Sequence, residues 1–270
     1  MQTYNPNSLD TICAALCYAM GIEPPAQAAP ANQTLCTYLD EALAGKKADR
    51  ILMYNPDAIG EWIWRKYTNL CGKLPPYTGV EVPLCTVMPS VTPVCFGTMY
   101  TGAQPAVHGI QKYEKPIIRI DTIFDALVRA GKKAAIVAHT PCSMAKIYLE
   151  RPIDYYIFDT FEEINACAAD LIIKDEYDFL AVYNGNYDAR MHKFGPESVE
   201  ALAELRTNCE QFAFYNQLVA RHWSAHNTLV GFAMDHGCHE IDGNCGSHGL
   251  DMPEDLNIVH LYRAYAAKQA

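Results

Sequence analysis

The sequence contains no apolar segment long enough to cross a membrane. The longest one near its start, from Thr11 to Met20, is much shorter than the roughly 20 residues that a membrane-spanning helix needs. No lysine or arginine precedes Lys46, so the basic region of a signal peptide is missing as well. These absences predict a cytoplasmic protein that has no membrane partner.

Basic residues are scarce, and they form no block along the chain. The sequence has 21 Lys and Arg residues against 31 Asp and Glu residues, which gives a formal net charge of −10. A nucleic-acid polymer binds to basic surfaces that neutralise its phosphates, so this composition argues against such a partner. A small anionic substrate would have to be attracted locally, for instance by metal ions.

The cysteines lack the spacing of a metal site or of a disulfide framework. The chain has 11 of them, an odd number, with no Cys-x-x-Cys pair, and several lie inside apolar runs. This pattern favours reduced, buried thiols over disulfides and argues against a zinc-thiolate site.

Repeats and low-complexity tracts are also absent, and strand-like and helix-like patterns alternate along the 270 residues. Short apolar runs predict strands at Arg50–Tyr54, Leu84–Met88, Lys133–Ala138, Asp154–Phe158, Asp178–Tyr183, Thr228–Met234 and Asn257–Tyr262. Helical periodicity fits Asp121–Ala130, Phe161–Ile173 and Glu197–Trp223. The alternation predicts an α/β fold with a single wound, mostly parallel central sheet and helices on both faces. We expect residues 1–270 to form one domain, with residues 1–49 as an N-terminal helical extension packed on it.

Side chains that commonly bind metals follow several of the predicted strands. Open α/β sheets place their chemistry at the carboxyl ends of their strands, so these side chains predict a metal site. The candidates are Asp57 after the first strand, Asp188 and His192 after the fifth, Asp235 and His236 after the sixth, and His248 in the glycine-rich loop beyond.

A candidate phosphate position follows the second predicted strand. Thr92-Pro93 is typical of a helix N-cap followed by proline at the first helical position. The Thr92 hydroxyl would then lie at the positive end of a helix, where a phosphate can dock.

Taken in order, these segments resemble the alkaline phosphatase superfamily, particularly its phosphodiesterase and nucleotide pyrophosphatase branch. The resemblance covers roughly residues 50 to 262. It is carried by Asp57, Pro89-x-x-Thr92 with Thr101-Gly102, Pro105-x-x-His108-Gly109-Ile110, Asp188-x-x-x-His192-x-x-Gly195-Pro196, Asp235-His236-Gly237, and His248-Gly249 with Met252-Pro253-Glu254.

The resemblance implies a two-metal phosphodiesterase or a related phosphoryl hydrolase. One divalent ion would be held by Asp188, His192 and His248, and the other by Asp57, Asp235, His236 and the Thr92 oxygen. Thr92 would be the metal-activated nucleophile, forming a phosphothreonine intermediate with a small phosphorylated substrate. The mixed imidazole and carboxylate ligands suit Zn²⁺, with Mn²⁺ as the alternative.

Departures from the family pattern leave the reaction open. Cys95 stands three residues after Thr92, where the diesterase branch typically has asparagine, and is either a substrate-pocket residue or a packing residue. Phosphomonoester hydrolysis, phosphonate hydrolysis, phosphomutase transfer and non-catalytic binding of a phosphorylated ligand are therefore alternatives. Arg190, between two of the implied ligands, is a candidate for steadying a phosphate oxygen. Asp57-Ala58 replaces the Asp-Gly that is usual in the family.

The N-terminal segment from Asn7 to Gly21-Ile-Glu-Pro-Pro25 resembles a helix and turn that many relatives carry near their C-terminus. It is either a relocated element that docks beside the last strand or a local helix ended by a glycine. We expect the loops Gly102–Pro116 and Gly237–Ser247 to line the substrate pocket. The sequence specifies neither the substrate nor the oligomeric state.

Overall fold

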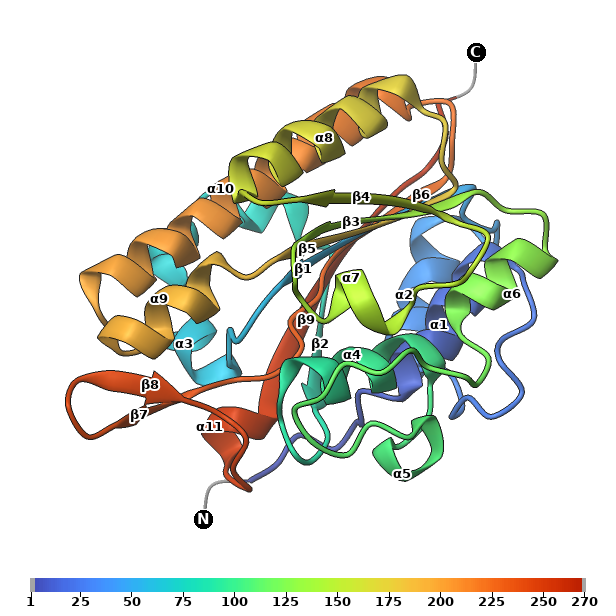
Figure 1. The fold of residues 1–270 in the computed structure, drawn as a ribbon. Helices are drawn as coiled ribbons and strands as arrows, with labels where there is room; N and C mark the ends of the chain where they lie inside the picture. The colour runs from blue at the N-terminus through green and yellow to red at the C-terminus, as the bar shows by residue number, and fades with distance from the viewer. Residues whose placement is uncertain (1–2, 269–270) are drawn as a thin grey trace.

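The computed structural model describes residues 3–268, which are organised around a seven-stranded sheet (Figure 1). Across the sheet the strands are β2 (Val80–Cys85), β9 (Asn257–Tyr265), β6 (Thr228–Phe232), β1 (Arg50–Pro56), β5 (Phe179–Asn184), β3 (Ala134–His139) and β4 (Asp154–Phe158). Strand β9 is antiparallel to both of its neighbours, β2 and β6, and all other pairs in this sheet are parallel. The mostly parallel sheet that the sequence predicts is confirmed.

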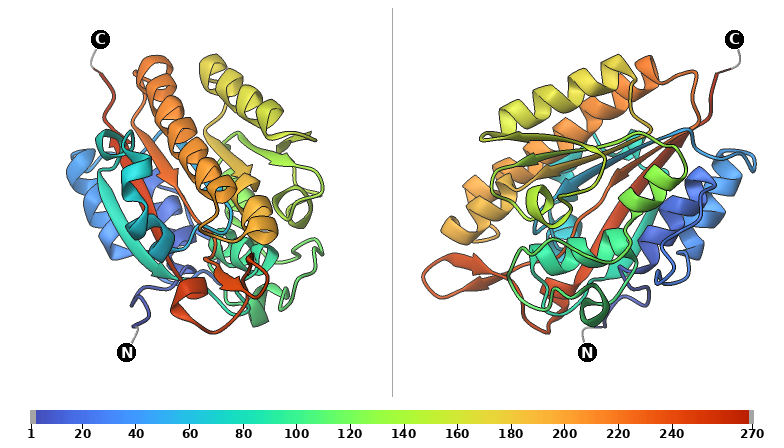
Figure 2. Two further views of the ribbon diagram at one scale, coloured as in Figure 1. Left: turned by 90° about the vertical axis from the view of Figure 1, so that its left-hand side faces the viewer. Right: turned by 45° about the vertical axis from the view of Figure 1, so that its right-hand side comes forward.

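Helices cover both faces of the sheet, as the alternating pattern predicts (Figures 1 and 2). One face carries α3 (Glu61–Lys66), α8 (Phe161–Lys174), α9 (Asn186–Phe194) and α10 (Val199–His222). The other face carries α1 (Thr11–Met20), α2 (Gln33–Ala42), α4 (Thr92–Thr101) and α6 (Ile123–Arg129). Shorter elements are η1 (Thr68–Cys71), η2 (Pro75–Tyr77), α5 (Pro105–His108), α7 (Met144–Ile147), the hairpin β7 (His239–Ile241) with β8 (Cys245–Ser247), and α11 (Pro253–Leu256).

The central strands are almost entirely buried, because helices pack against them from both sides. Every residue of β5 and β6 is buried, and in β1 only Arg50 is partly exposed. Buried parallel strands appear in a sequence as continuous apolar runs, which is why these three were recognisable. Each large aliphatic side chain buried there contributes about 1.5–3 kcal/mol to folding, so the core holds the strand ends in fixed positions.

The second predicted strand, Leu84–Met88, is wrong in its position. The observed strand β2 ends at Cys85, where β9 begins at Asn257, so pairing between the two stops there. Beyond Cys85 the chain turns toward the end of β6, and the Thr86 hydroxyl donates a hydrogen bond to the carbonyl of Asp235. Pro83 lies within β2, which is tolerated because this strand is at the edge of the sheet.

The N-terminal helices contribute to the same hydrophobic core as the sheet. Helix α1 ends at Gly21, whose left-handed backbone (φ 66°) caps the helix, and it packs against α2, α4 and α6. Helix α2 contacts the last strand β9. After the Pro-Pro turn, the Ala29 amide donates to the carbonyl of Gly102, which ties this segment to the end of α4.

The prediction that the thiols are reduced is wrong for one pair. Cys71 in η1 and Cys209 in α10 form a disulfide, although 138 positions separate them in sequence. Packing of η1 against α10 brings the two sulfurs together, and no sequence spacing indicates such a contact. The other nine cysteines are free. Within residues 3–268, no helix combines the length and apolarity needed to span a membrane.

Candidate metal centre

Two groups of carboxylate and imidazole side chains meet at the carboxyl end of the parallel strands. Asp57 follows β1, and Asp235 and His236 follow β6, the strand next to β1. On the other side of β1, strand β5 leads into α9, which carries Asp188 and His192. The structure therefore places this pair on a helix that begins just past the end of β5. His248 directly follows β8.

The first group consists of Asp57, Asp235 and His236, with Thr92 beside them. The Nε2 atom of His236 lies 3.3 Å from Oδ1 of Asp57 and 3.4 Å from Oδ2 of Asp235. The Thr92 hydroxyl oxygen lies 3.4 Å from both Asp57 Oδ2 and His236 Nε2. All four side chains are at most 5% exposed. One ion placed among these atoms could contact all four residues.

The second group consists of Asp188, His192 and His248. The Nε2 atom of His192 lies 3.1 Å from Nε2 of His248 and 3.2 Å from Oδ1 of Asp188. The same carboxylate oxygen lies 3.6 Å from Nε2 of His248. The two groups adjoin, because the rings of His236 and His248 contact each other at a tilt of 30°, with their centroids 4.1 Å apart.

Backbone carbonyls orient all three imidazoles in the same way. The Nδ1 atoms of His192, His236 and His248 lie 3.0, 2.9 and 3.0 Å from the carbonyl oxygens of Gly246, Gly237 and Ser90, respectively. A carbonyl only accepts hydrogen bonds, so Nδ1 carries the proton and Nε2 keeps its lone pair. This is the arrangement that metal-binding histidines usually adopt, and it directs each Nε2 into its group.

Three carboxylate oxygens in these groups are buried without a hydrogen-bond partner among the described residues: Asp57 Oδ1, Asp188 Oδ1 and Asp235 Oδ2. Burial and the neighbouring carboxylates of Asp235 and Asp188 raise the pKa of Asp57 well above its usual value, and burial also raises the pKa of Asp235. Buried negative charges crowded together in this way need a compensating cation. The donor set therefore fits divalent metal ions.

Neighbouring groups fix the ligands of the first group. The Tyr183 hydroxyl donates a 2.5 Å hydrogen bond to Oδ2 of Asp57, and the Ala58 amide donates a 3.1 Å hydrogen bond to Oδ1 of Asp235. Ala58 has a left-handed backbone (φ 64°), so it keeps the turn for which relatives typically use glycine, at some cost in strain. Tyr183 is not among the site residues predicted from the sequence, because its only signal there is a hydroxyl at the end of a buried strand.

Helix α4 begins one residue earlier than the capping pattern predicts. Its N-cap is Val91, so Thr92 and Pro93 are the first two helical residues. Thr92 still lies at the helix N-terminus, where the partial positive charge of the backbone favours an anion.

Two further predicted site residues lie outside both groups. Cys95 on α4 is fully buried, and burial raises its pKa well above the usual value. Arg190 lies half a turn from Asp188 and His192 on α9 and so points to the other side of that helix. There it faces Glu204 of α10 at 3.8 Å and borders a polar hollow of about 440 Å³ between α8, α9 and α10.

Comparison with known proteins gives one family and several solved structures. Residues 76–257 match the profile of a family described as type I phosphodiesterase / nucleotide pyrophosphatase. Murine ectonucleotide pyrophosphatase / phosphodiesterase 5 has a similar structure, with a TM-score of 0.54 and 18% identity over 72% of this chain and 58% of the murine one. Phosphonoacetate hydrolase from Sinorhizobium meliloti gives a TM-score of 0.54 and 17% identity, over 74% of this chain and 61% of its own.

The chain thus spans only about three fifths of the length of these structural relatives. At such low identity the structural likeness supports the fold alone. No match is found among curated protein sequences.

Proposed function

Because the chain belongs to the type I phosphodiesterase / nucleotide pyrophosphatase family, which its match over residues 76–257 establishes, we propose that it hydrolyses phosphoric esters of a small molecule at Thr92. The membership predicted from the sequence is thereby confirmed. The proposed reaction extends it to a named nucleophile and to named metal ligands.

One observation carries the proposal: the Thr92 hydroxyl lies 3.4 Å from two side chains of a metal-binding type, at the N-terminus of a buried helix. Asp57, Asp235 and His236 would hold one divalent ion with Thr92, and Asp188, His192 and His248 would hold the other. Such ions, Zn²⁺ in the first instance, would lower the pKa of the hydroxyl and offset the charge of the phosphoryl oxygens.

The proposed reaction has two steps. The Thr92 oxygen attacks phosphorus and releases its proton to water, while the bond from phosphorus to the leaving-group oxygen breaks and its electron pair leaves with that oxygen. The product of this step is a phosphothreonine. Water then attacks the phosphorus, the bond to Thr92 breaks, and the hydroxyl regains a proton. Negative charge that develops next to Thr92 is stabilised by the N-terminal end of α4.

A relative supports a small phosphorylated substrate. The murine phosphodiesterase 5 has been solved as an inactive threonine-to-alanine variant in complex with AMP. For the present chain, a nucleotide-like ester is therefore a reasonable first substrate class to test.

The test compares wild-type protein with Thr92→Ala after metal reconstitution, using bis-p-nitrophenyl phosphate and p-nitrophenyl phosphate, with metal content measured on the same samples. We expect Thr92→Ala to abolish turnover while its metal content stays close to that of the wild type. Thr98→Ala is the matched control, because Thr98 is a buried threonine of the same helix whose hydroxyl contacts His108 and neither metal group. Turnover that survives in Thr92→Ala would refute the nucleophile.

The two reporters also separate the alternatives. Cys95, in place of an asparagine, removes an amide that relatives typically direct at a phosphate oxygen, so a monoester or phosphonate preference is the second candidate. A preference for the monoester would support it. Two bound metals with no turnover on either reporter or on phenylphosphonate would instead favour a binding protein.

A further inference from the structure

The segment from Gly109 to Ile118 is anchored at both ends. At its start, the Ile110 amide donates to Nδ1 of His108, so the protonated Nε2 of this ring can donate to the Thr98 hydroxyl, 3.1 Å away. His108 is buried beneath α4, with Thr98 and the closely approaching Gly97. The first anchor therefore ties the segment to the helix that begins with Thr92.

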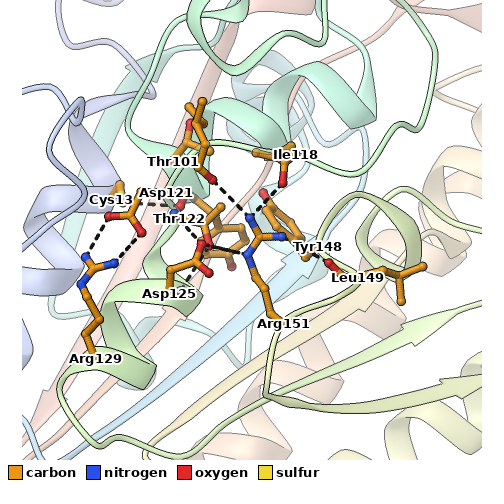
Figure 3. Close-up of polar contacts among 12 residues, drawn as sticks. Cys13, Thr101, Ile118, Asp121, Thr122, Asp125, Arg129, Tyr148, Leu149 and Arg151 are labelled. Atoms are coloured by element: carbon orange, nitrogen blue, oxygen red, sulfur yellow. Dashed lines mark hydrogen bonds and ion pairs between the residues drawn. The ribbon is translucent and has the colours of Figure 1, made fainter.

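Arg151 provides the second anchor (Figure 3). Its guanidinium donates to the carbonyls of Ile118 (3.0 Å) and Ile120 (3.2 Å) and pairs with Asp125 at 2.9 Å. The Arg151 side chain is only 7% exposed, so water screens these contacts little. With both ends fixed, the residues between them are held in place before a ligand arrives, which reduces the entropy lost on binding.

Lys115, within this segment, has hydrogen-bond donors that bind no described residue. Its ammonium donates to the carbonyl of Pro141 at 2.9 Å and lies 5.3 Å from the ring centroid of Tyr113. An ammonium has three donors, and Lys115 forms no ion pair with any residue that the structure describes. The neighbouring Lys112, in contrast, pairs with Glu114.

Lys115 contacts the chain at the same edge of the sheet as the candidate metal centre. Pro141 and Cys142 follow β3, which adjoins β5, and β5 carries the Tyr183 that donates to Asp57. Burial raises the pKa of the Cys142 thiol to about 12, and Asp57 adds to this rise while Lys115 opposes it. The charges of Asp57 and Lys115 therefore both act on this thiol. Burial and the carboxylates of Asp57 and Asp188 likewise raise the pKa of Tyr113.

We propose that Lys115, held beside Tyr113, binds a second anionic group of the substrate, a carboxylate or a further phosphate, away from the reacting phosphorus. This proposal rests on the proposed function and specifies its substrate class. The chain carries a net charge of −10, and Arg190, the cation that the sequence analysis predicts for a phosphate oxygen, faces Glu204 on the far side of α9. An anionic substrate group therefore needs a local cation, and Lys115 is placed to supply it.

The experiment uses three monoesters that share one reacting linkage: phenyl phosphate, 3-carboxyphenyl phosphate and 1,3-phenylene bisphosphate. We expect wild-type protein to prefer the two probes that carry a second anionic group. Lys115→Gln should lower kcat/KM for them by about 10- to 100-fold, the usual loss for a hydrogen bond to a charged group, and leave phenyl phosphate unchanged. Lys115→Arg should restore part of the preference. Lys112→Gln, in the same loop, is the matched control and should resemble the wild type.

The larger of the two effects identifies the group as carboxylate or phosphate. Equal losses on all three probes, or no preference in the wild type, would overturn the role of Lys115 while Thr92-dependent turnover remains. If no probe is hydrolysed, calorimetry of their binding to Thr92→Ala, with and without Lys115→Gln, still decides. Binding that depends on Lys115, without turnover of these probes or of bis-p-nitrophenyl phosphate, would overturn the proposed hydrolysis only, whereas equal binding would overturn the proposed anion site.

Discussion

Tyr183 provides the sharpest test of the first metal group, because it touches a proposed ligand without being one. Its hydroxyl is 2.5 Å from Oδ2 of Asp57, and the two side chains are only 6% and 1% exposed. The change Tyr183→Phe removes this donor and keeps the aromatic ring. Asp57 then loses the hydrogen bond that favours its charged form, in a place where burial already disfavours it.

The size of the effect follows from that single contact. A buried hydrogen bond to a charged group contributes about 1.5–3 kcal/mol, and 1.4 kcal/mol corresponds to a factor of ten in affinity. We therefore expect Tyr183→Phe to weaken binding of one metal ion by about 10- to 100-fold, which agrees with typical losses for residues that support metal ligands. The second ion should be affected much less, because no hydrogen bond joins Tyr183 to Asp188, His192 or His248 in the described part of the chain.

The assay is calorimetric titration of metal-free protein with Zn²⁺ in the presence of a competing chelator, which resolves the two affinities. Tyr148→Phe is the matched control, because its buried hydroxyl donates to the carbonyl of Phe96 and not to a carboxylate. Unchanged affinities in Tyr183→Phe would refute the reasoning. Equal weakening at both sites, or the same loss in Tyr148→Phe, would show that the effect comes from general loosening of the fold.

Two further predictions concern stability. Burial and the charge of His236 lower the pKa of His248 to about 3. Below pH 6.5, His248 is therefore protonated in the unfolded chain but stays neutral in the folded protein. Metal-free wild-type protein should therefore lose stability as the pH falls from 6.5 toward 3, by up to about 1.4 kcal/mol per pH unit more than His248→Gln does; parallel thermal-unfolding curves would contradict this. Reduction of the Cys71–Cys209 disulfide, which closes a segment with a separation of 138 residues, should lower the free energy of unfolding by about 2–4 kcal/mol, and the double variant Cys71→Ala/Cys209→Ala should not respond to reductant. Titration of denatured, unreduced protein should find nine free thiols; a count of eleven would show that the bond does not form.

The positions of the candidate ligands were accessible from sequence because the strands that carry them are simple. Strands β1, β5 and β6 are buried on both faces, so each is a short apolar run, and Asp57, Asp188 and Asp235 come soon after these runs. Parallel strands end at one edge of a sheet, which brings residues far apart in sequence to one place. The structure places these side chains within two adjoining groups, at the edge where the pattern predicts them.

The surroundings of the ligands were not accessible in this way. His192 is oriented by the carbonyl of Gly246, in the β7–β8 hairpin, and a backbone carbonyl leaves no trace in a sequence. Tyr183 resembles any aromatic residue of a buried strand until its hydroxyl is found beside Asp57. Arg190 is the opposite case. Its place between two ligands in the sequence predicts a role at the phosphate, but the helical repeat turns its side chain toward Glu204 of α10.

The sequence alone therefore determined the order of strands and helices, the family and the kinds of side chain at the strand ends, since these depend on local periodicity and on short segments. Tertiary structure decided which carbonyl orients each imidazole, which carboxylate oxygens remain unpaired and where Lys115 lies relative to Asp57. It also decided that Cys71 meets Cys209. Apart from the contact between His236 and the adjacent Gly237, these contacts join residues tens to more than a hundred positions apart, and they exist only once the sheet and its helices have packed together.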